Sequence, residues 1–336
     1  MKRVQSFVLC LLFAAFFSSC ESLLPSDTAP VDTSGISIKE VDVFVEYTSA
    51  KVYGDISVST NPERITGIRV YYGDTSSDLK KSVTAAYDTQ NGFSADLTSL
   101  EDGKQFFYRV DIMVGKTPVE GTISDFVTFP QGPVELDLPS GKKWASHNVG
   151  AKNPTERGDH FAWGETTKKE QYSWSTYKYC LDGDYLHKLT KYVDNTYSSA
   201  SGMPDNLVTL QRTDDAAIAN MGKEWRTPTR QEWQELIDYG VIKHVKINNI
   251  QGVIVSSKKN MNDSKKFIFI PEYPGKYTGT QFYELGSAYW TATLSDGASV
   301  NEYARVITMT TGDSFIVNLH SQRCEGLSIR AIYDGN

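Results

Sequence analysis

"RTPTRQEWQELIDYG", residues 226–240, contains the clearest helix signal in the chain. Thr229 can cap a helix through its hydroxyl, and Glu232, three residues later, can reach back to the Thr229 amide. Gly240 stands where a left-handed C-cap is expected. The apolar residues between them fall at positions i, i+3 and i+4 and form one stripe: Trp233, Leu236 and Ile237. The spacing predicts an amphipathic helix that packs one face onto a core.

A second short helix is predicted just upstream, in "TDDAAIANMG", residues 213–222. Thr213 is its expected cap and Gly222 its expected end, and two aspartates favour its positive end. The segment between the helices carries Trp225, and Trp233 follows inside the second helix. Tryptophan is common in ligand sites and in cores. We interpret this stretch as scaffold that packs both helices onto a sheet, and not as a site.

The composition indicates two globular domains and argues against nucleic-acid binding. The chain has 336 residues, more than one ordinary domain holds. Hydrophobic residues make up 40% and charged residues 22%, which is typical of folded proteins. The formal net charge is −7, whereas a protein that binds phosphate backbones needs a basic face. We therefore expect no nucleic-acid partner.

The N-terminus predicts export. "MKR" is a positive n-region, and "FVLCLLFAAFF", residues 7–17, is an apolar segment too short to span a bilayer as a mature helix. Residues 1–19 are therefore predicted to be a signal peptide. "FFSSC" then ends at Cys20 and resembles the lipobox of bacterial lipoproteins, with Phe17 where that pattern prefers leucine. The resemblance implies that Cys20 carries acyl chains such as palmitate, which anchor by burying methylenes in the membrane. The alternative is an ordinary signal peptide with Cys20 incidental.

Residues 20–35 and 36–130 differ sharply in pattern. The first are rich in Ser, Thr, Pro and Asp and read as a flexible, lipidated tether. The second alternate with period two, as Val41, Val43 and Val45 show, with turn signals between short runs. Short strands at this spacing predict an all-β sandwich of the fibronectin III or immunoglobulin type.

"LTSLEDGKQFFYRVDI", residues 97–112, resembles the fibronectin type III pattern in which a leucine precedes a turn and an aromatic strand. Leu100 fits that leucine, and Phe106, Tyr108 and Val110 are expected to face the core. The family's corner tyrosine is replaced by Phe106, which has no hydroxyl to form the corner hydrogen bond.

A second domain is predicted over residues 131–336. Prolines and glycines interrupt the strand pattern at residues 129–141, and all six tryptophans lie beyond this joint. Several segments then occur in an order that closely resembles the Fibrobacter succinogenes major paralogous domain: "LDLPSGKKWASHNVGA", "GDHFAWGETT", "YSWSTYKYC", "DDAAIANMGKEWRTPTRQEW", "SAYWTATL" and "SIRAI". The resemblance implies an α+β, C-type-lectin-like fold related to the formylglycine-generating enzymes, with no established activity.

Catalytic and metal signals are weak in this domain. The related enzymes use a pair of cysteines near the C-terminus, and only Cys324 lies there, so we expect no enzyme activity. Calcium-lectin motifs and metal-binding histidine spacings are missing, so we expect no metal and no cofactor. Cys180 and Cys324 could form a disulfide in an exported protein or remain two buried free thiols.

Two segments are candidate ligand sites. "GDHFAWGE" combines two carboxylates, an imidazole and an indole, which suit a glycan: Asp159, His160, Trp163 and Glu165. The alternative is a loop that fixes itself around a buried Trp163. "YSWSTYKY", residues 172–179, offers Trp174 and three tyrosines as a second aromatic platform.

These observations predict a cell-envelope lipoprotein of the outer membrane, surface-exposed and held by its lipid anchor. Its second domain is expected to recognise a glycan or a surface protein without catalysis. One alternative is a structural component of a surface or fimbrial assembly. The other is a formylglycine-generating-type enzyme, which the missing second cysteine disfavours.

Overall fold

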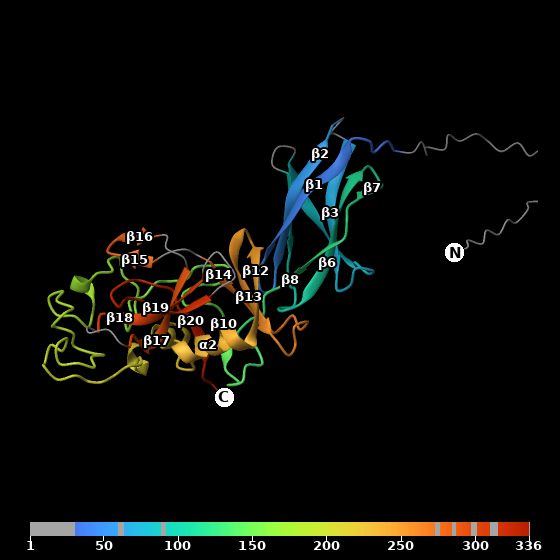
Figure 1. Ribbon diagram of the computed structural model, residues 1–336. Coiled ribbons are helices and arrows are strands. Elements are labelled where there is room, and N and C mark those ends of the chain that lie inside the picture. Colours follow the sequence, from blue (N-terminus) through green and yellow to red (C-terminus); the bar gives the residue numbers. More distant parts are fainter. Residues whose placement is uncertain are drawn as a thin grey trace, which may run out of the picture.

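The computed structural model describes most of the chain from residue 31 onward (Figure 1). The described ranges are 31–59, 64–88, 92–272, 276–283, 287–296, 301–309 and 315–335. The predicted signal peptide, Cys20 and the tether up to residue 30 lie outside these ranges. In the part of the chain that is described, no helix combines the length and the apolar character needed to cross a membrane.

The first strands form a β-sandwich. β1, β2 and β5 make one layer, and β3, β6, β7 and β8 make the other. β4 joins both layers, because its first half pairs with β3 and its last three residues pair with β5. The bounds are β1 (Ile36–Val45), β2 (Ala50–Val58), β3 (Ile65–Gly73), β4 (Lys81–Asp88), β5 (Gly92–Leu97), β6 (Gln105–Val114), β7 (Thr117–Glu120) and β8 (Ser124–Val127).

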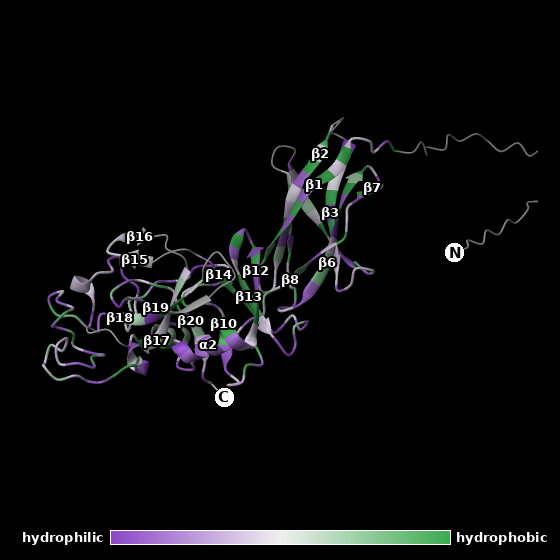
Figure 2. Cartoon of the chain, viewed as in Figure 1, coloured by the Kyte–Doolittle hydropathy of each residue, from purple (hydrophilic) through white to green (hydrophobic). Residues whose placement is uncertain are grey.

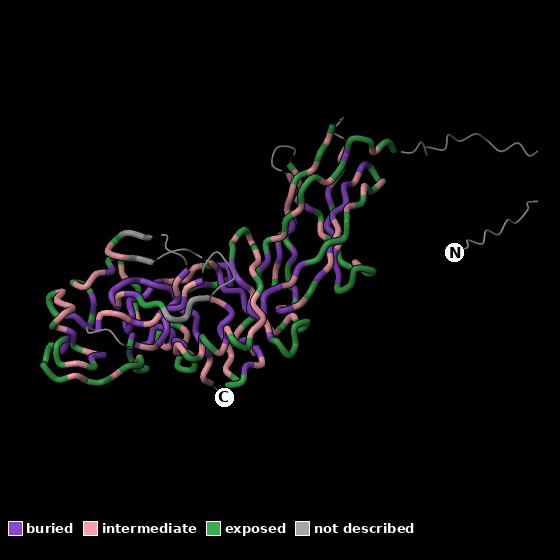
Figure 3. Tube along the Cα trace, viewed as in Figure 1, coloured by how far each residue is buried: buried purple, intermediate pink, exposed green. Residues whose placement is uncertain are grey.

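The alternation predicted from sequence is confirmed in this sandwich. In β1, Val45 is buried and Val41 and Val43 are half-buried, while the residues between them are exposed. In β6, Phe106, Tyr108 and Val110 are all buried, as is Leu100 in the preceding turn. Figure 3 shows this buried line between the two exposed faces. Period two therefore sorted the side chains correctly into core and solvent.

The C-terminal region contains helices and four small sheets. The strand orders are β11-β20-β10-β9, β12-β13-β14, β15-β16 and β17-β18-β19. The bounds are β9 (Pro133–Glu135), β10 (Lys143–Asn148), η2 (Trp174–Thr176), η3 (Arg212–Asp214), α1 (Ala216–Met221), β11 (Trp225–Arg226), α2 (Arg230–Tyr239), β12 (Gly240–Ile247), β13 (Ile250–Ser257), β14 (Phe267–Pro271), β15 (Lys276–Thr278), β16 (Gln281–Tyr283), β17 (Ser287–Leu294), β18 (Tyr303–Met309), β19 (Phe315–Gln322) and β20 (Arg330–Tyr333).

Both predicted helices are present, but two of their predicted ends are wrong. The capping box of α2 is confirmed, with Thr229 and Glu232 bonded to each other's backbone. Gly240 is extended at φ −80° and not left-handed, because β12 starts at this residue and continues the chain as a strand. The cap of α1 is Asp215 and not Thr213, since the Asp215 carboxylate accepts from the Ala217 N–H. The same carboxylate also accepts from the Thr227 backbone at 2.8 Å and so ties α1 to the segment before α2.

One strand serves the cores of both regions. β14 alternates so that Phe267 and Phe269 belong to the cluster that fills the sandwich, whereas Ile268 and Ile270 belong to the cluster under α2. Phe269 lies 6.2 Å, between ring centroids, from Phe129 at the end of the sandwich. The sheet of β12, β13 and β14 is therefore a wall between two apolar cores (Figure 2).

The tip of the β12–β13 hairpin holds the end of β1. Asn248 and Asn249 form the tip, both with positive φ, as a tight hairpin of this kind requires. The Asn248 side-chain amide accepts from the Val45 N–H at 2.7 Å and donates to the Val45 carbonyl at 2.8 Å. The hairpin thus contacts the sandwich through its backbone as well as its core.

A half-buried histidine, His147, lies at the same junction. Tyr47, after β1, shares hydrogen bonds with Ser146 at 3.0 Å and with Nδ1 of His147 at 2.8 Å. Burial, with a smaller effect from the nearby Arg330, lowers the pKa of His147 to about 4, and Glu156 partly opposes the shift. The ring is therefore neutral at neutral pH.

We expect the free energy of unfolding to fall as the pH drops from about 6.5 toward 4. In that window unfolded His147 binds a proton that folded His147 does not, so acid favours unfolding by on the order of 1 kcal/mol per pH unit at most. Chemical denaturation across this range measures the slope. His147→Gln should reduce the slope but not abolish it, because the pKa of His160 is lowered in the same way. An unchanged slope would show that His147 does not contribute.

Candidate functional site

The loops after β10 carry both candidate segments. Residues 149–215, all of them described, run almost entirely as loops, with only two 3-10 helices of three residues each. They lie at the end of the molecule opposite to the first described residue (Figure 1). Many of their residues are exposed (Figure 3). Loops held on a scaffold are common places for binding sites.

Trp163 cannot serve as a ligand platform. Its side chain is only 1% exposed. The indole N–H donates to the Thr291 carbonyl at 2.8 Å, and the ring packs edge-on against Tyr192 with centroids 4.9 Å apart. The candidate role of Trp163 in binding is therefore corrected: the loop "GDHFAWGE" closes around this side chain, as the alternative interpretation stated.

A buried arginine completes the packing below Trp163. Arg323 lies with its guanidinium carbon 5.2 Å from the Trp163 ring centroid. It donates to the Tyr177 hydroxyl at 3.0 Å and to the Asn301 carbonyl at 2.9 Å. Cation–π contacts and carbonyl acceptors stabilise its charge in this core. The arrangement fixes the loops and leaves no surface for a ligand here.

The other candidate residues of this segment, Asp159, His160 and Glu165, do not share one site. Asp159 and His160 line an open depression of about 420 Å³, and Lys168 pairs with Asp159 at 2.8 Å. Burial, with a smaller effect from a neighbouring arginine, lowers the pKa of His160 to about 4. Glu165 is buried and pairs with Lys169 at 2.8 Å, and it also accepts from the Lys178 backbone. Asp159 and His160 thus reach a cavity, whereas Glu165 holds neighbouring loops together.

Trp174 is the candidate residue that offers an aromatic face near the surface. It is half-buried and stacks on Tyr185 with ring centroids 5.0 Å apart and planes at 25°. Its indole N–H has no hydrogen-bond partner among the described residues. Tyr177, which follows, supports it edge-on from the buried side at 5.4 Å. The stack of Trp174 on Tyr185 is thus supported by Tyr177 on its buried side and is half-exposed to solvent.

A second aromatic pair comes from residues distant in sequence. Tyr303 of β18 is half-buried and packs against exposed His320 of β19, with ring centroids 4.6 Å apart. Burial raises the pKa of Tyr303, Glu302 adds to the shift, and Tyr185 makes a smaller electrostatic contribution. We call Trp174, Tyr185, Tyr303 and His320 the aromatic surface. Tyr185, Tyr303 and His320 were not predicted, because strand pairing brings β18 and β19 to the loops and no local pattern records it.

The aromatic surface has carboxylates at its margin. Asp184 precedes Tyr185 and receives the His187 backbone N–H at 3.3 Å. Glu302 precedes Tyr303 and is half-buried, and burial raises its pKa. Aromatic faces beside hydrogen-bonding oxygens are what a site for a polar ligand with apolar faces needs.

The two cysteines are free thiols in the structure. Cys180 and Cys324 are both buried in the same apolar cluster and neither forms a disulfide. The structure therefore agrees with the alternative of two buried free thiols and not with a disulfide. Burial raises the pKa of the Cys324 thiol to about 12 and that of Cys180 to about 11. Both are therefore protonated at neutral pH, whereas a reactive cysteine needs a thiolate.

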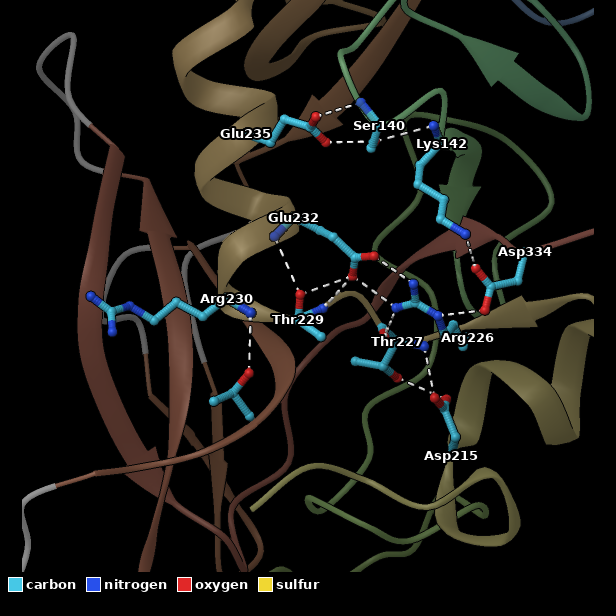
Figure 4. A network of polar contacts seen from close by, with 11 residues as sticks. Ser140, Lys142, Asp215, Arg226, Thr227, Thr229, Arg230, Glu232, Glu235 and Asp334 are labelled. Atoms are coloured by element: carbon cyan, nitrogen blue, oxygen red, sulfur yellow. Dashed lines mark hydrogen bonds and ion pairs between the residues drawn. The ribbon is translucent and has the colours of Figure 1, made fainter. Parts of the chain in front are cut away.

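The stretch around Arg226 belongs to the scaffold (Figure 4). Arg226 donates to Glu232 and to Asp334, each at 2.7 Å, and Lys142 pairs with the same Asp334. Burial alone would raise the pKa of Glu232, but the hydrogen bonds from Arg226 and Thr229 lower it. The network ties the start of α2 to the segment before β10 and to the end of β20. Two cations, Lys142 and Arg226, are thus paired with the carboxylates of Glu232 and Asp334, as expected for a structural network.

Over the described ranges, no three or more His, Cys, Asp or Glu residues come together in a way that could hold a metal ion.

No protein-family model matches this chain, and no curated protein matches it. Some solved structures are similar to part of it. The sixth fibronectin type III domain of human fibronectin type III domain containing protein 3 is 18% identical, and the match covers 30% of this chain and 92% of that one at a TM-score of 0.24. The third fibronectin III domain of human KIAA0343 protein is 20% identical, with 32% and 97% covered at a TM-score of 0.23. At these TM-scores the likeness carries no argument, and the sandwich rests on its own strand pairing and core.

Proposed function

We propose that the chain is a cell-envelope lipoprotein that presents a non-catalytic glycan-binding module. The proposal takes the lipobox-like "FFSSC" for an anchor in the outer membrane at Cys20. In this proposal, residues 131–336 form a Fibrobacter succinogenes major paralogous domain with a C-type-lectin-like fold, because the motifs of that family occur there in the same order. The fibronectin III-like sandwich then separates the binding loops from the anchor.

The stack of Trp174 on Tyr185 carries the glycan proposal. Sugar rings have apolar C–H faces and polar edges, so they suit an aromatic face with carboxylates beside it. Asp184 and Glu302 supply such oxygens next to Tyr185 and Tyr303. The high pKa of buried Cys324 supports binding over thiol-dependent catalysis.

Trp174→Ala should weaken glycan binding by about tenfold, because loss of the indole removes a stacking face worth about 0.5–1.5 kcal/mol beyond the apolar area it buries. A glycan array, run on the purified full chain with calcium and with chelator, first identifies the ligand. Titration of that glycan then compares the variant with the parent chain.

Tyr239→Ala is the matched control, because Tyr239 is an exposed aromatic on α2, outside the aromatic surface. It should bind as the parent chain does. A broad array without any hit, or equal binding by Trp174→Ala with its fold intact, would overturn the glycan proposal.

A second candidate function is a structural component of a surface assembly. The observation that favours it is the edge strand β1, which has a strand neighbour on one side.

A further inference from the structure

A groove runs along the open side of the sandwich, between β1 and the β7–β8 segment. One part, of about 630 Å³, is lined by residues of β1, β6, β8 and the β12–β13 hairpin. A second part, of about 410 Å³, continues along β1 toward its start. Val41 and Tyr108 line both parts, so the two are neighbours along one strand. The lining is apolar in its depth, since Tyr108 and Phe126 are core residues.

One side of this groove is formed by the outer edge of β1. β1 pairs with β2 on one side, and no described strand pairs with its other side. At the hairpin end, Asn248 satisfies both backbone groups of Val45 on that other side. A residue of an added antiparallel strand makes this same pair of bonds, one accepted from N–H and one donated to C=O. Asn248 therefore occupies the place of one residue of a strand that is otherwise missing.

The alternation of β1 says which groups come next. Successive residues of a strand direct their backbone groups to opposite edges, and the β1–β2 register is continuous from Glu40 to Val45. The N–H and C=O of Val43 and Val41 therefore point to the same side as those of Val45. These are the groups that an added strand would pair, in line with Asn248.

The charge of the groove indicates which strand would fit. Asp42 and Asp125 line its first part and lie close enough to Tyr108 to raise its pKa along with burial. Lys246 lines the same part beside the hairpin tip, and Lys39 and Glu120 line the second part, so the two aspartates are the acidic groups that line the groove beside Val41 and Val43. In the described part of the chain neither carboxylate has an ion-pair partner, although Asp125 accepts from Gln105 at 2.9 Å. A strand with basic side chains on one face and apolar side chains on the other would complement both the carboxylates and the core.

We propose that this groove binds an extended peptide of a partner protein, with alternating apolar and basic residues, which adds to β1 as a strand beyond Asn248. Backbone pairing would supply the affinity, and the alternate side chains would supply the specificity. This site is separate from the aromatic surface and does not depend on glycan binding.

The test uses a peptide of about six residues, alternating valine and lysine, which is long enough to lie along Val41 to Val45. Binding to the purified full chain is measured by calorimetry up to about 1 mM. Hydrogen exchange at the amides of Val41 and Val43 is followed in parallel. We expect binding with slowed exchange at both amides. The same peptide methylated on alternate backbone nitrogens keeps its charge and should not bind.

Val43→Pro removes one outward N–H and leaves the β1–β2 ladder intact, a substitution that edge strands tolerate. It should weaken peptide binding by about tenfold or more, whereas Val43→Ala, which keeps the N–H, should bind within about twofold of the parent chain. Asp42→Asn with Asp125→Asn should weaken binding and reduce its salt dependence. Trp174→Ala should bind the peptide normally.

Absence of peptide binding would overturn the proposal, as would equal binding of the methylated peptide or an unchanged affinity in a folded Val43→Pro variant. Concentration-dependent dimerisation that protects the same two amides without peptide would also overturn it, because the occupant would then be a second copy of the chain.

Discussion

Replacing Phe269 by alanine is expected to lower the free energy of unfolding by about 3–5 kcal/mol, the usual cost of a large cavity in a packed core. Phe269 is fully buried and faces the sandwich from a strand that belongs to the C-terminal region. Its loss leaves space beside Phe129 and weakens contacts of both regions at once. Chemical denaturation should therefore show both regions unfolding in one transition at a lower midpoint.

The matched control is Phe44→Ala, since Phe44 lies on the exposed face of β1 and its removal should change stability by about 0.5 kcal/mol or less. Near-ultraviolet circular dichroism reports the tryptophans, all of which lie after the sandwich. Far-ultraviolet signal reports the strands of both regions. If Phe269→Ala split the two signals into transitions with unchanged tryptophan stability, the shared core would not couple the regions.

The second large effect is expected for Arg330, a buried cation that has no carboxylate partner among the residues the structure describes. Its guanidinium donates to the Asn148 side chain at 2.9 Å, the Ala145 carbonyl at 3.0 Å and the Phe269 carbonyl at 2.9 Å. Arg330→Met fills a similar volume but leaves three buried acceptors unsatisfied. We expect a loss of about 3 kcal/mol or more in the free energy of unfolding, since each such acceptor costs about 1–3 kcal/mol.

Arg330→Lys distinguishes geometry from charge. Lysine keeps the positive charge but has no planar fork, so it cannot reach three divergent acceptors at once. Burial lowers the pKa of Arg330 to about 10, which still leaves the guanidinium charged at neutral pH. Both variants should be destabilised in the same denaturation experiment. A stable Arg330→Lys protein would show that charge alone is enough at this position.

Local patterns in the sequence predicted local structure well. Period two located the sandwich strands, and the Thr229–Glu232 spacing located the start of α2, because both depend on residues close together in the chain. The C-cap at Gly240 failed because tertiary pairing continued the chain as β12. The wall strand "FIFIP" has apolar residues on both faces, and no local signal says that each face meets a different core.

The candidate site shows the same limit. Trp163 and Trp174 look alike in sequence, since both lie in loops beside carboxylates or tyrosines. Burial separates them, and that depends on Thr291, Tyr192 and Arg323, which come from elsewhere in the chain. The contact between Tyr303 on β18 and His320 on β19 likewise depends on strand pairing, which no local pattern in the sequence records.

The wall strand β14 also limits how the molecule can be rearranged by recombination. A domain whose core is complete in itself can be joined to a new partner domain by recombination. Here Phe267 and Phe269 project out of the C-terminal region into the core of the sandwich. If the C-terminal region were fused to a different domain, these two side chains would form an exposed apolar patch. A domain that replaced the sandwich would need an apolar cavity that accommodates Phe267 and Phe269. It would also need an unpaired backbone N–H and C=O for the Asn248 side chain. The two regions are therefore expected to be inherited together, with changes at this seam occurring in pairs.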